Sequence, residues 1–345
     1  MKVGLTGFAG SGKTTVFSAL TGLRPDPGER RPLWGTIKVP DPRVDFLASV
    51  YHPKKTTYAE VTFVDFPPAR DAQKRAVLDQ EMVTALRDAD ALVEVVRGFP
   101  DLAGAAPRPA EDIADFESEL VLADLGQVEK RLERCRKEKG KEREVALLER
   151  LQGHLDAGQP LRTLVLSADE RTELAGFAFL SLRPLLVVLN VPESDVAKPL
   201  PAAVAERARE AGAEAMVLSA QVEAEVAELE PGDRVAFLAD LGLSESARDR
   251  FIRASYGLLD LISFLTAGDD ECRAWPIRRG TGARKAAGRI HSDIERGFIR
   301  AEVMAYDDFV QLPSEAKCRE AGKLRLEGKD YVVQDGDIVH FRFAV

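Results

Sequence analysis

The run Gly7-Phe8-Ala9-Gly10-Ser11-Gly12-Lys13-Thr14 decides the fold, because it matches the phosphate-loop pattern G-x-x-x-x-G-K-[ST] at every position. A strand-like segment, residues 2–6, precedes the run, and a helix-like segment begins at Thr15. Glycines let backbone N–H groups approach phosphate oxygens, and the start of a helix adds partial positive charge. Lys13 can reach the terminal phosphates and the Thr14 hydroxyl can ligate magnesium. The sequence therefore predicts a site for a nucleoside triphosphate.

Composition limits the class of protein. The 345 residues exceed one ordinary core, so we expect two or three domains, and the 45% hydrophobic content is that of a soluble globular protein. With no apolar run of about 18 residues and no leader-like segment, we expect a cytoplasmic protein without a membrane partner. Three scattered cysteines favour reduced thiols, and the net charge of -9 argues against non-specific coating of nucleic acid.

Strand-like and helix-like segments alternate in two parts of the chain, residues 1–112 and 161–255. This alternation predicts an α/β domain with a mainly parallel sheet and crossover helices. The charged stretch between them, residues 113–160, carries two apolar stripes at helical spacing, one from Val121 to Cys135 and one from Val145 to Leu155. We expect an inserted helical hairpin there, whose charges form a solvated face.

Residues 256–345 have a different pattern and predict a small α+β domain of the β-grasp kind. Segments 297–309 and 329–345 read as strands, and segment 283–294 reads as one helix. Residues 278–300 are rich in arginine and lysine, which suits RNA phosphates and suits ordinary surface decoration equally well.

Further site residues follow later strands. Asp65 ends the strand-like run 61–65 and is expected to hold magnesium together with Thr14. The apolar run 185–189 leads into Asn190-Val191-Pro192-Glu193, where guanine-specific proteins have N-K-x-D. Glu193 and Val191 depart from that pattern, so strict guanine selectivity is not expected. Ser219 and Ala220 follow the next strand and are expected to border the base.

These motifs together resemble the Obg-like ATPases, the YchF branch of the translation-factor-related P-loop GTPases, over essentially the whole chain. The resemblance is strongest in the C-terminal third, at residues 264–268, 273–275, 297–303 and 327–331 with Asp335-Gly336-Asp337. It implies a G domain, an inserted helical hairpin and a C-terminal TGS domain. It also implies that Gly10, Ser11, Gly12, Lys13, Thr14 and Thr15 hold the phosphates and Mg²⁺. Family members prefer ATP to GTP, a choice linked to Asn190 and Glu193 here, and associate with ribosomes.

The chain departs from this family at three places that sense the γ-phosphate. Pro68 replaces the glycine of the D-x-A-G motif, and proline has no N–H to donate. The threonine that closes over magnesium has no counterpart, since Thr36 aligns better with the next strand. Glu94 stands where relatives have a histidine proposed to assist hydrolysis. Glu94 would act as a base if burial raised its pKa, or it would be a strand residue paired with an arginine.

Three functions follow as alternatives. The first is a slowly hydrolysing ATPase, with GTP as another substrate, that acts as a switch on a ribosome or another RNA-bearing partner through its TGS-like domain. The second is a non-hydrolysing nucleotide-binding interaction protein with degenerate switch loops. The third, a small-molecule kinase, is disfavoured by the TGS-like end. Nothing in the sequence requires a dimer, so we expect a monomer.

The base-recognition hypothesis makes a direct prediction. Changing Val191→Lys together with Glu193→Asp restores the guanine-specific pattern and should raise affinity for GTP relative to ATP, because a shorter carboxylate suits the guanine edge. Competition between the two nucleotides, measured on both proteins, checks this. An unchanged ratio would remove residues 190–193 from base recognition.

Overall fold

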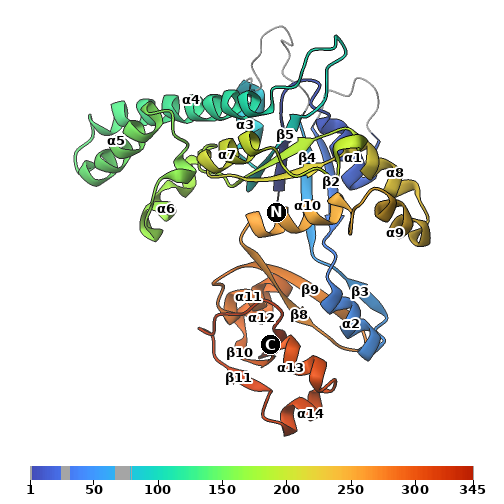
Figure 1. Ribbon diagram of the computed structural model, residues 1–345. Helices are drawn as coiled ribbons and strands as arrows, with labels where there is room; N and C mark the ends of the chain where they lie inside the picture. The colour runs from blue at the N-terminus through green and yellow to red at the C-terminus, as the bar shows by residue number, and fades with distance from the viewer. Residues whose placement is uncertain (1, 25–31, 67–77, 79, 345) are drawn as a thin grey trace. The chain divides into compact units, whose positions relative to one another are not determined.

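The computed structural model describes residues 2–24, 32–66, 78 and 80–344. They form two compact units, drawn in Figure 1: Met1–Ile37 with Thr62–Ser255, and Lys38–Val61 with Tyr256–Val345. The elements of the first sheet and its helices are β1 (Lys2–Thr6), α1 (Lys13–Thr21), β2 (Leu33–Lys38), β4 (Glu60–Asp65), α3 (Gln80–Leu86), β5 (Ala91–Arg97), α4 (Pro109–Cys135), α5 (Glu142–Asp156), η1 (Leu161–Thr163), α6 (Ala168–Leu174), η2 (Ala175–Phe177), β6 (Leu185–Asn190), η3 (Glu193–Asp195), α7 (Ala202–Glu210), β7 (Glu214–Leu218), α8 (Ala220–Glu228), α9 (Pro231–Asp240) and α10 (Ala247–Leu258).

The first sheet confirms the expected α/β architecture. Its strand order is β2-β4-β1-β5-β6-β7, and β1 pairs in parallel with both β4 and β5, as does β6 with β5 and β7. Strand β6 is buried along its whole length, as expected for an apolar strand covered on both faces. Parallel strands place their carboxyl ends at one edge, so the loops after β1, β4, β5, β6 and β7 meet there.

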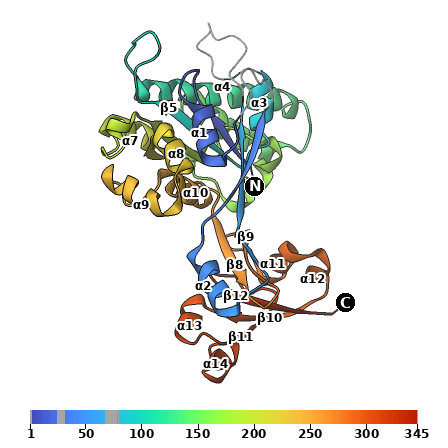
Figure 2. The same cartoon turned by 90° about the vertical axis from the view of Figure 1, so that its right-hand side faces the viewer.

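Helices cover both faces of this sheet. On one face α3, α4 and α7 supply apolar side chains such as Leu86, Phe116 and Val204 to a core that includes Leu92 and Val187 of the sheet. On the other face α1 lies beside α8, as Figure 2 shows, and Phe251 of α10 packs on Phe63 of β4 with ring centroids 5.3 Å apart. The sheet is therefore the middle layer of three.

The hairpin expected between residues 113 and 160 is present. Helices α4 and α5 lie side by side in Figure 1 and share a core with the segment that returns to the sheet. Val128 and Leu132 of α4 face Leu148 and Leu151 of α5, all at most 2% exposed. The apolar stripes seen in the sequence thus pack on each other, and the base of α4 continues into the main core.

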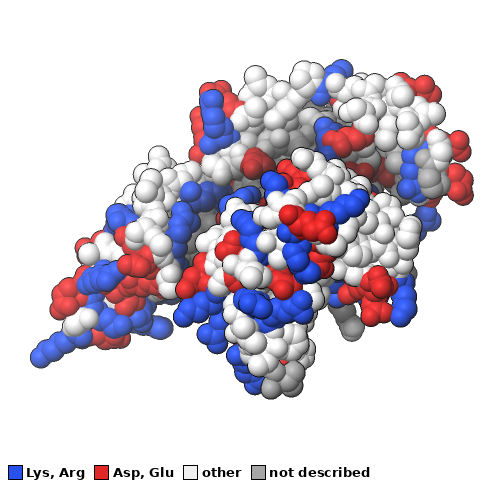
Figure 3. Space-filling view, turned by 90° about the horizontal axis from the view of Figure 1, so that it is seen from below, with Lys and Arg blue, Asp and Glu red and all other residues white. Residues whose placement is uncertain are grey.

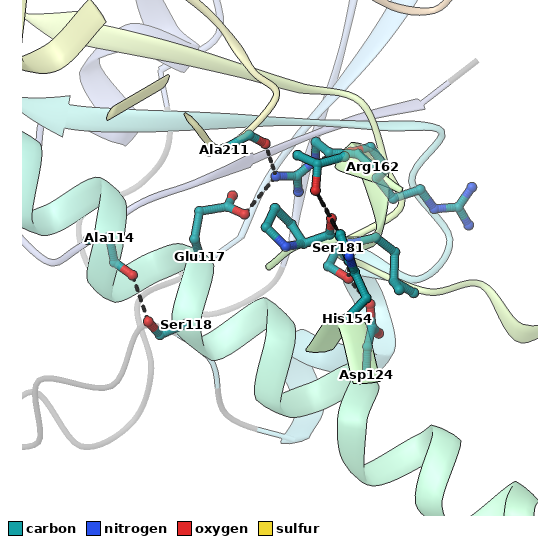
Figure 4. Close-up of polar contacts among 12 residues, drawn as sticks. Ala114, Glu117, Ser118, Asp124, His154, Arg162, Ser181 and Ala211 are labelled. Atoms are coloured by element: carbon teal, nitrogen blue, oxygen red, sulfur yellow. Dashed lines mark hydrogen bonds and ion pairs between the residues drawn. The ribbon is translucent and has the colours of Figure 1, made fainter. Parts of the chain in front are cut away.

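A buried polar cluster fastens the base of the hairpin to the returning chain (Figure 4). The Asp124 carboxylate accepts hydrogen bonds from the Leu180 and Ser181 backbone N–H groups at 3.0 and 2.7 Å, and from the Ser181 hydroxyl at 2.7 Å. Arg162 donates to Glu117 at 2.6 Å and to the Ala211 carbonyl at 3.1 Å. Both side chains of the Arg162–Glu117 ion pair are less than a tenth exposed. Because the pair is buried, removing either partner would leave the other charge unpaired inside the protein and lower its stability.

The second unit is built on a mixed sheet with the order β11-β10-β12-β8-β9-β3. Its elements are α2 (Pro42–Tyr51), β3 (Lys55–Thr57), β8 (Leu261–Thr266), β9 (Glu271–Arg278), α11 (Ala283–Ile290), α12 (Ser292–Arg296), β10 (Phe298–Met304), α13 (Tyr306–Gln311), α14 (Glu315–Glu320), β11 (Arg325–Glu327) and β12 (Ile338–Phe343). Ala283, Ala286 and Ala287 of α11 pack on the sheet. This is the grasp-like α+β arrangement expected of a TGS domain.

The structure differs from the sequence expectations in four places. One is the strand expected over 329–345, which covers only Ile338–Phe343 (β12), because a turn around Gly336 precedes it. Residues 38–61, assigned above to the first domain, lie in the second unit, because β3 pairs in parallel with β9. The single helix expected over 283–294 is wrong, since extended backbone at His291 separates α11 from α12. The strand expected over 297–309 ends at Met304, and helix α13 begins at Tyr306. Within the described ranges, no helix combines the length and the apolarity that crossing a membrane requires.

The hairpin anchor gives a stability prediction. Asp124→Ala should lower the free energy of unfolding by about 3 kcal/mol, because buried donors on Leu180 and Ser181 lose their acceptor. Urea unfolding followed by far-UV circular dichroism measures the change. The control is Ser118→Ala on the same helix, whose exposed hydroxyl bonds only to Ala114 of the preceding turn; it should change stability by less than about 0.5 kcal/mol. Equal effects would contradict the anchoring role.

Candidate functional site

The phosphate loop joins β1 to α1, and its glycines are required by its geometry. Gly7, Gly10 and Gly12 have φ values of 138°, 78° and 86°, in the region that favours glycine. A Cβ on Gly12 would lie 2.2 Å from Asn190 Nδ2, and a Cβ on Gly7 would lie 2.3 Å from the Val95 carbonyl oxygen. The loop is therefore held close against the ends of β5 and β6. Around Gly10 there is open space, so the outer part of the loop can receive a ligand.

Lys13, Thr14 and Asp65 come together at the carboxyl edge of the sheet. Burial lowers the pKa of the Lys13 ammonium, and the nearby Asp65 carboxylate opposes that shift. Burial also raises the pKa of Asp65, against the charge of Lys13 and a hydrogen bond from the Thr14 hydroxyl. Asp65 Oδ1 has no hydrogen-bond partner within the described part of the chain. A buried carboxylate with an open oxygen, beside a hydroxyl, is a donor set that fits Mg²⁺.

Asn190 connects three parts of the site. Its amide nitrogen Nδ2 donates to the Ser11 carbonyl at 3.0 Å, and its oxygen Oδ1 accepts from the Ala220 backbone N–H at 3.0 Å. The side chain is 4% exposed. Asn190 therefore positions the phosphate loop and the start of α8 relative to β6.

The other residues expected to border a base are placed around Asn190. Val191 is buried in the core on the α4 side of the sheet, whereas Glu193 is exposed at the start of η3. Ser219 is the N-cap of α8, its hydroxyl accepting from the Val222 N–H at 3.5 Å. Ser11 is buried, whereas Thr14 and Thr15 are exposed along the first turn of α1. The expected residues thus lie along one edge of the sheet.

Phe99 was missed by the sequence reasoning. A Cβ on Gly12 would lie 4.0 Å from Phe99 Cζ, so the aromatic ring stands beside the phosphate loop. Arg97 holds the segment in place by donating to the Phe99 carbonyl at 3.0 Å. The available signal was an aromatic residue directly after the carboxyl end of a central strand, a position from which side chains reach the ligand crevice.

Glu94 lies inside the protein. Its side chain is fully buried on β5, and neither carboxylate oxygen has a hydrogen-bond partner among the described residues. Burial raises the pKa of Glu94 well above its usual value, and the neighbouring Glu117 adds to the rise while Arg162 opposes it. The arginine expected near Glu94 is thus Arg162, but its direct ion pair is with Glu117. Burial therefore favours the protonated, neutral form of Glu94.

Of the two other departures from the family pattern, only Thr36 can be placed. Thr36 lies on β2, with its hydroxyl 3.3 Å from that of Thr62, so it is a strand residue as the alignment favoured. Pro68 lies outside the described residues.

The sheet is mainly parallel, a glycine-rich loop precedes a helix that begins with a buried lysine, and a neighbouring strand ends in an acidic residue. These features define the class of P-loop nucleotide-binding proteins. Comparisons with known proteins narrow this class. Residues 261–344 match the family YchF-GTPase_C, described as "Protein of unknown function (DUF933)".

Similarity to two relatives extends over the whole chain. The Haemophilus ducreyi protein named ribosome-binding ATPase YchF is 40% identical over 360 residues, covering 100% of this chain and 99% of the relative. The Bacillus subtilis protein of the same name is 38% identical over 365 residues, covering 100% of both. The solved structure of the Schizosaccharomyces pombe YchF GTPase superposes with a TM-score of 0.88 at 28% identity, covering 99% of this chain and 97% of that one. The chain belongs to the YchF family.

The burial of Glu94 predicts a pH effect. Folding raises the pKa of this carboxyl above its unfolded value. The contribution of the protonated carboxyl to the free energy of unfolding is therefore fully present below about pH 4, and it is lost as the pH rises towards the folded pKa. Glu94→Gln removes that titration. We expect the variant to gain stability relative to the wild type as the pH rises above about 4, the unfolded pKa of a glutamate, as measured by urea midpoints at each pH. A difference that is independent of pH would contradict the raised pKa of Glu94.

Proposed function

We propose that this protein binds and slowly hydrolyses ATP, with GTP as a second substrate, and acts as a nucleotide-dependent switch on the ribosome. The observation that carries the proposal is the complete phosphate loop, with Lys13 buried at its end and Asn190 bonded to its backbone. The names of the full-length relatives, ribosome-binding ATPases, support both the reaction and the partner.

The residues present suit each part of the nucleotide. Backbone N–H groups between Gly10 and Thr15, at the N-terminus of α1, would hold the phosphates. Lys13 would neutralise charge on the β- and γ-phosphates, and Thr14 and Asp65 would hold Mg²⁺. When bound, the ion would stabilise negative charge on the phosphates. Lys13 and Asp65 are close enough for the charge of each to shift the pKa of the other, as expected of groups that share one phosphate and metal site.

The base would lie beside Phe99, Val191 and the loop at Ser219 and Ala220. Guanine is recognised by a carboxylate that accepts two hydrogen bonds, and Glu193 is longer than the aspartate that performs this role in guanine-specific sites. The exposed position of Glu193 and the aromatic ring of Phe99 favour recognition through stacking and backbone contacts. ATP is therefore the proposed main substrate.

Slow turnover is proposed because the groups that would act on the γ-phosphate have changed. Hydrolysis needs a positioned water and stabilised charge at that phosphate. Pro68 offers no N–H, and the fully buried carboxyl of Glu94 cannot take a proton from water without first becoming exposed. These features favour the second candidate function, a nucleotide-binding protein that does not hydrolyse. Retained turnover in Glu94→Gln would exclude Glu94 as the catalytic base, whereas a loss of about 100-fold would support that role.

The proposed contact with ribosomal RNA lies in the second unit. Lys285 and Arg289 project from α11, are exposed, and have no ion pair among the residues the structure describes. The face drawn in Figure 3 has a mixed surface, with Lys and Arg side chains interspersed with Asp and Glu. This distribution suits a local contact with phosphates better than general coating of nucleic acid. A monomer in the cytoplasm completes the proposal.

The decisive experiment measures phosphate release from magnesium-ATP and magnesium-GTP, with and without ribosomes. We expect turnover that is faster with ATP, rises with ribosomes and falls about 100-fold in Lys13→Ala, because that substitution removes the cation at the terminal phosphates. The Lys13→Ala protein also serves as the control for contaminating enzymes. Nucleotide binding without release above that control would establish the non-hydrolysing alternative.

A further inference from the structure

A second cavity lies in the first unit, between α3 and α4, where the two helices run beside each other in Figures 1 and 2. Its volume is about 530 Å³, within the range of about 300–1,000 Å³ typical of small-molecule sites. Its lining includes Arg87, Lys130, Arg131, Arg134 and Phe177, and no acidic residue among those that the structure describes. None of these residues belongs to the proposed nucleotide site.

The cations that line this cavity differ in whether they form ion pairs. Arg131 bonds to Glu144 at 2.7 Å, and this hydrogen bond lowers the pKa of the glutamate to about 2. Lys130 and Arg134, one helical turn apart on α4, are exposed and have no ion pair among the described residues. Two adjacent cations that are not ion-paired within the described residues therefore stand at one cavity, in a chain whose net charge is -9. Such cations suit a phosphate group.

The floor of the cavity is fixed by hydrogen bonds. Gln127 accepts from Arg87 of α3 and donates to the Phe177 carbonyl at 2.9 Å, so it links both helices to the segment that carries the ring. Arg183 donates to the Arg87 carbonyl at 2.9 Å. The Phe177 ring is half-buried and stacks on Phe179 with centroids 5.1 Å apart. An aromatic residue is thus held in the cavity lining, together with cations and an amide.

We propose that this cavity binds a phosphorylated small molecule of mononucleotide size. Its phosphate lies on Lys130 and Arg134, and its ring packs on Phe177. The aromatic face and the amide of Gln127 favour a ligand with a planar, hydrogen-bonding group over phosphate alone. A long nucleic acid is disfavoured because exposed Glu129 and Glu133 flank the two cations on α4 and would repel an extended phosphate backbone.

The test is isothermal titration of the full chain with AMP, GMP and UMP at low salt, with magnesium-ADP saturating the phosphate loop. We expect one additional mononucleotide per chain. Lys130→Gln with Arg134→Gln should weaken it at least tenfold, and Phe177→Leu should weaken it while leaving pyrophosphate binding unchanged. The matched control is Lys139→Gln with Arg171→Gln, the same loss of charge at two exposed residues outside the cavity that have no ion pair in the described part of the chain; it should leave affinity unchanged.

Three results would overturn the assignment. They are no mononucleotide binding at millimolar concentration, equal weakening by the control pair, and binding that disappears in Lys13→Ala, which would place the ligand in the phosphate loop. Binding of a single-stranded RNA oligomer through Lys130 and Arg134, with none of the mononucleotides, would replace the proposed ligand by RNA. Each readout is independent of phosphate release, so failure here is distinguishable from failure of the proposed ATPase function.

Discussion

The candidate site depends on the side-chain amide of one residue, Asn190. Its two hydrogen bonds join the phosphate loop, the end of β6 and the start of α8, three segments far apart in sequence. Because the amide is buried, losing either bond would leave a backbone group without a partner in a dry environment. The close approach it enforces also explains Gly12, where a Cβ would collide with the amide nitrogen. The Asn190 side chain thus fixes the position of the phosphate loop against β6, and the loop in turn needs glycine at position 12.

The base of the hairpin poses a different physical problem, since ionisable groups are buried there together. Arg162 and Glu117 pair directly, and Asp124 satisfies backbone donors of the returning chain. Glu94 shares this environment without a partner of its own among the described residues, and the same holds for Glu117 Oε1 and Arg162 Nη2. A buried polar atom that is left unpaired costs stability. The cluster therefore ties the position of the hairpin to the ionisation of residues on β5.

Short-range sequence patterns predicted the local elements of the fold correctly. The phosphate loop, the parallel strands and the apolar stripes of α4 and α5 follow from short-range periodicity, and the structure confirms them. The placement of residues 38–61 in the second unit could not be read in this way, since the pairing of β3 with β9 joins segments more than two hundred residues apart. Phe99 was missed for a related reason: its significance lies in its distance from Gly12, which no spacing rule reports.

For two site residues, the sequence motif identified the position correctly but did not reveal the contacts of the side chain. Asn190 was identified from its resemblance to a base-recognition sequence, yet its side chain is bonded to backbone groups of the protein. Glu94 was identified from a position associated with hydrolysis, yet it is fully buried. In both cases the residue type fits the motif, and only the partners reveal what the side chain does. Binding elements are organised by such internal contacts before ligand arrives, whereas hydrolysis needs groups that face the γ-phosphate and water. Retention of the first set and alteration of the second is the physical argument for the slow turnover proposed above.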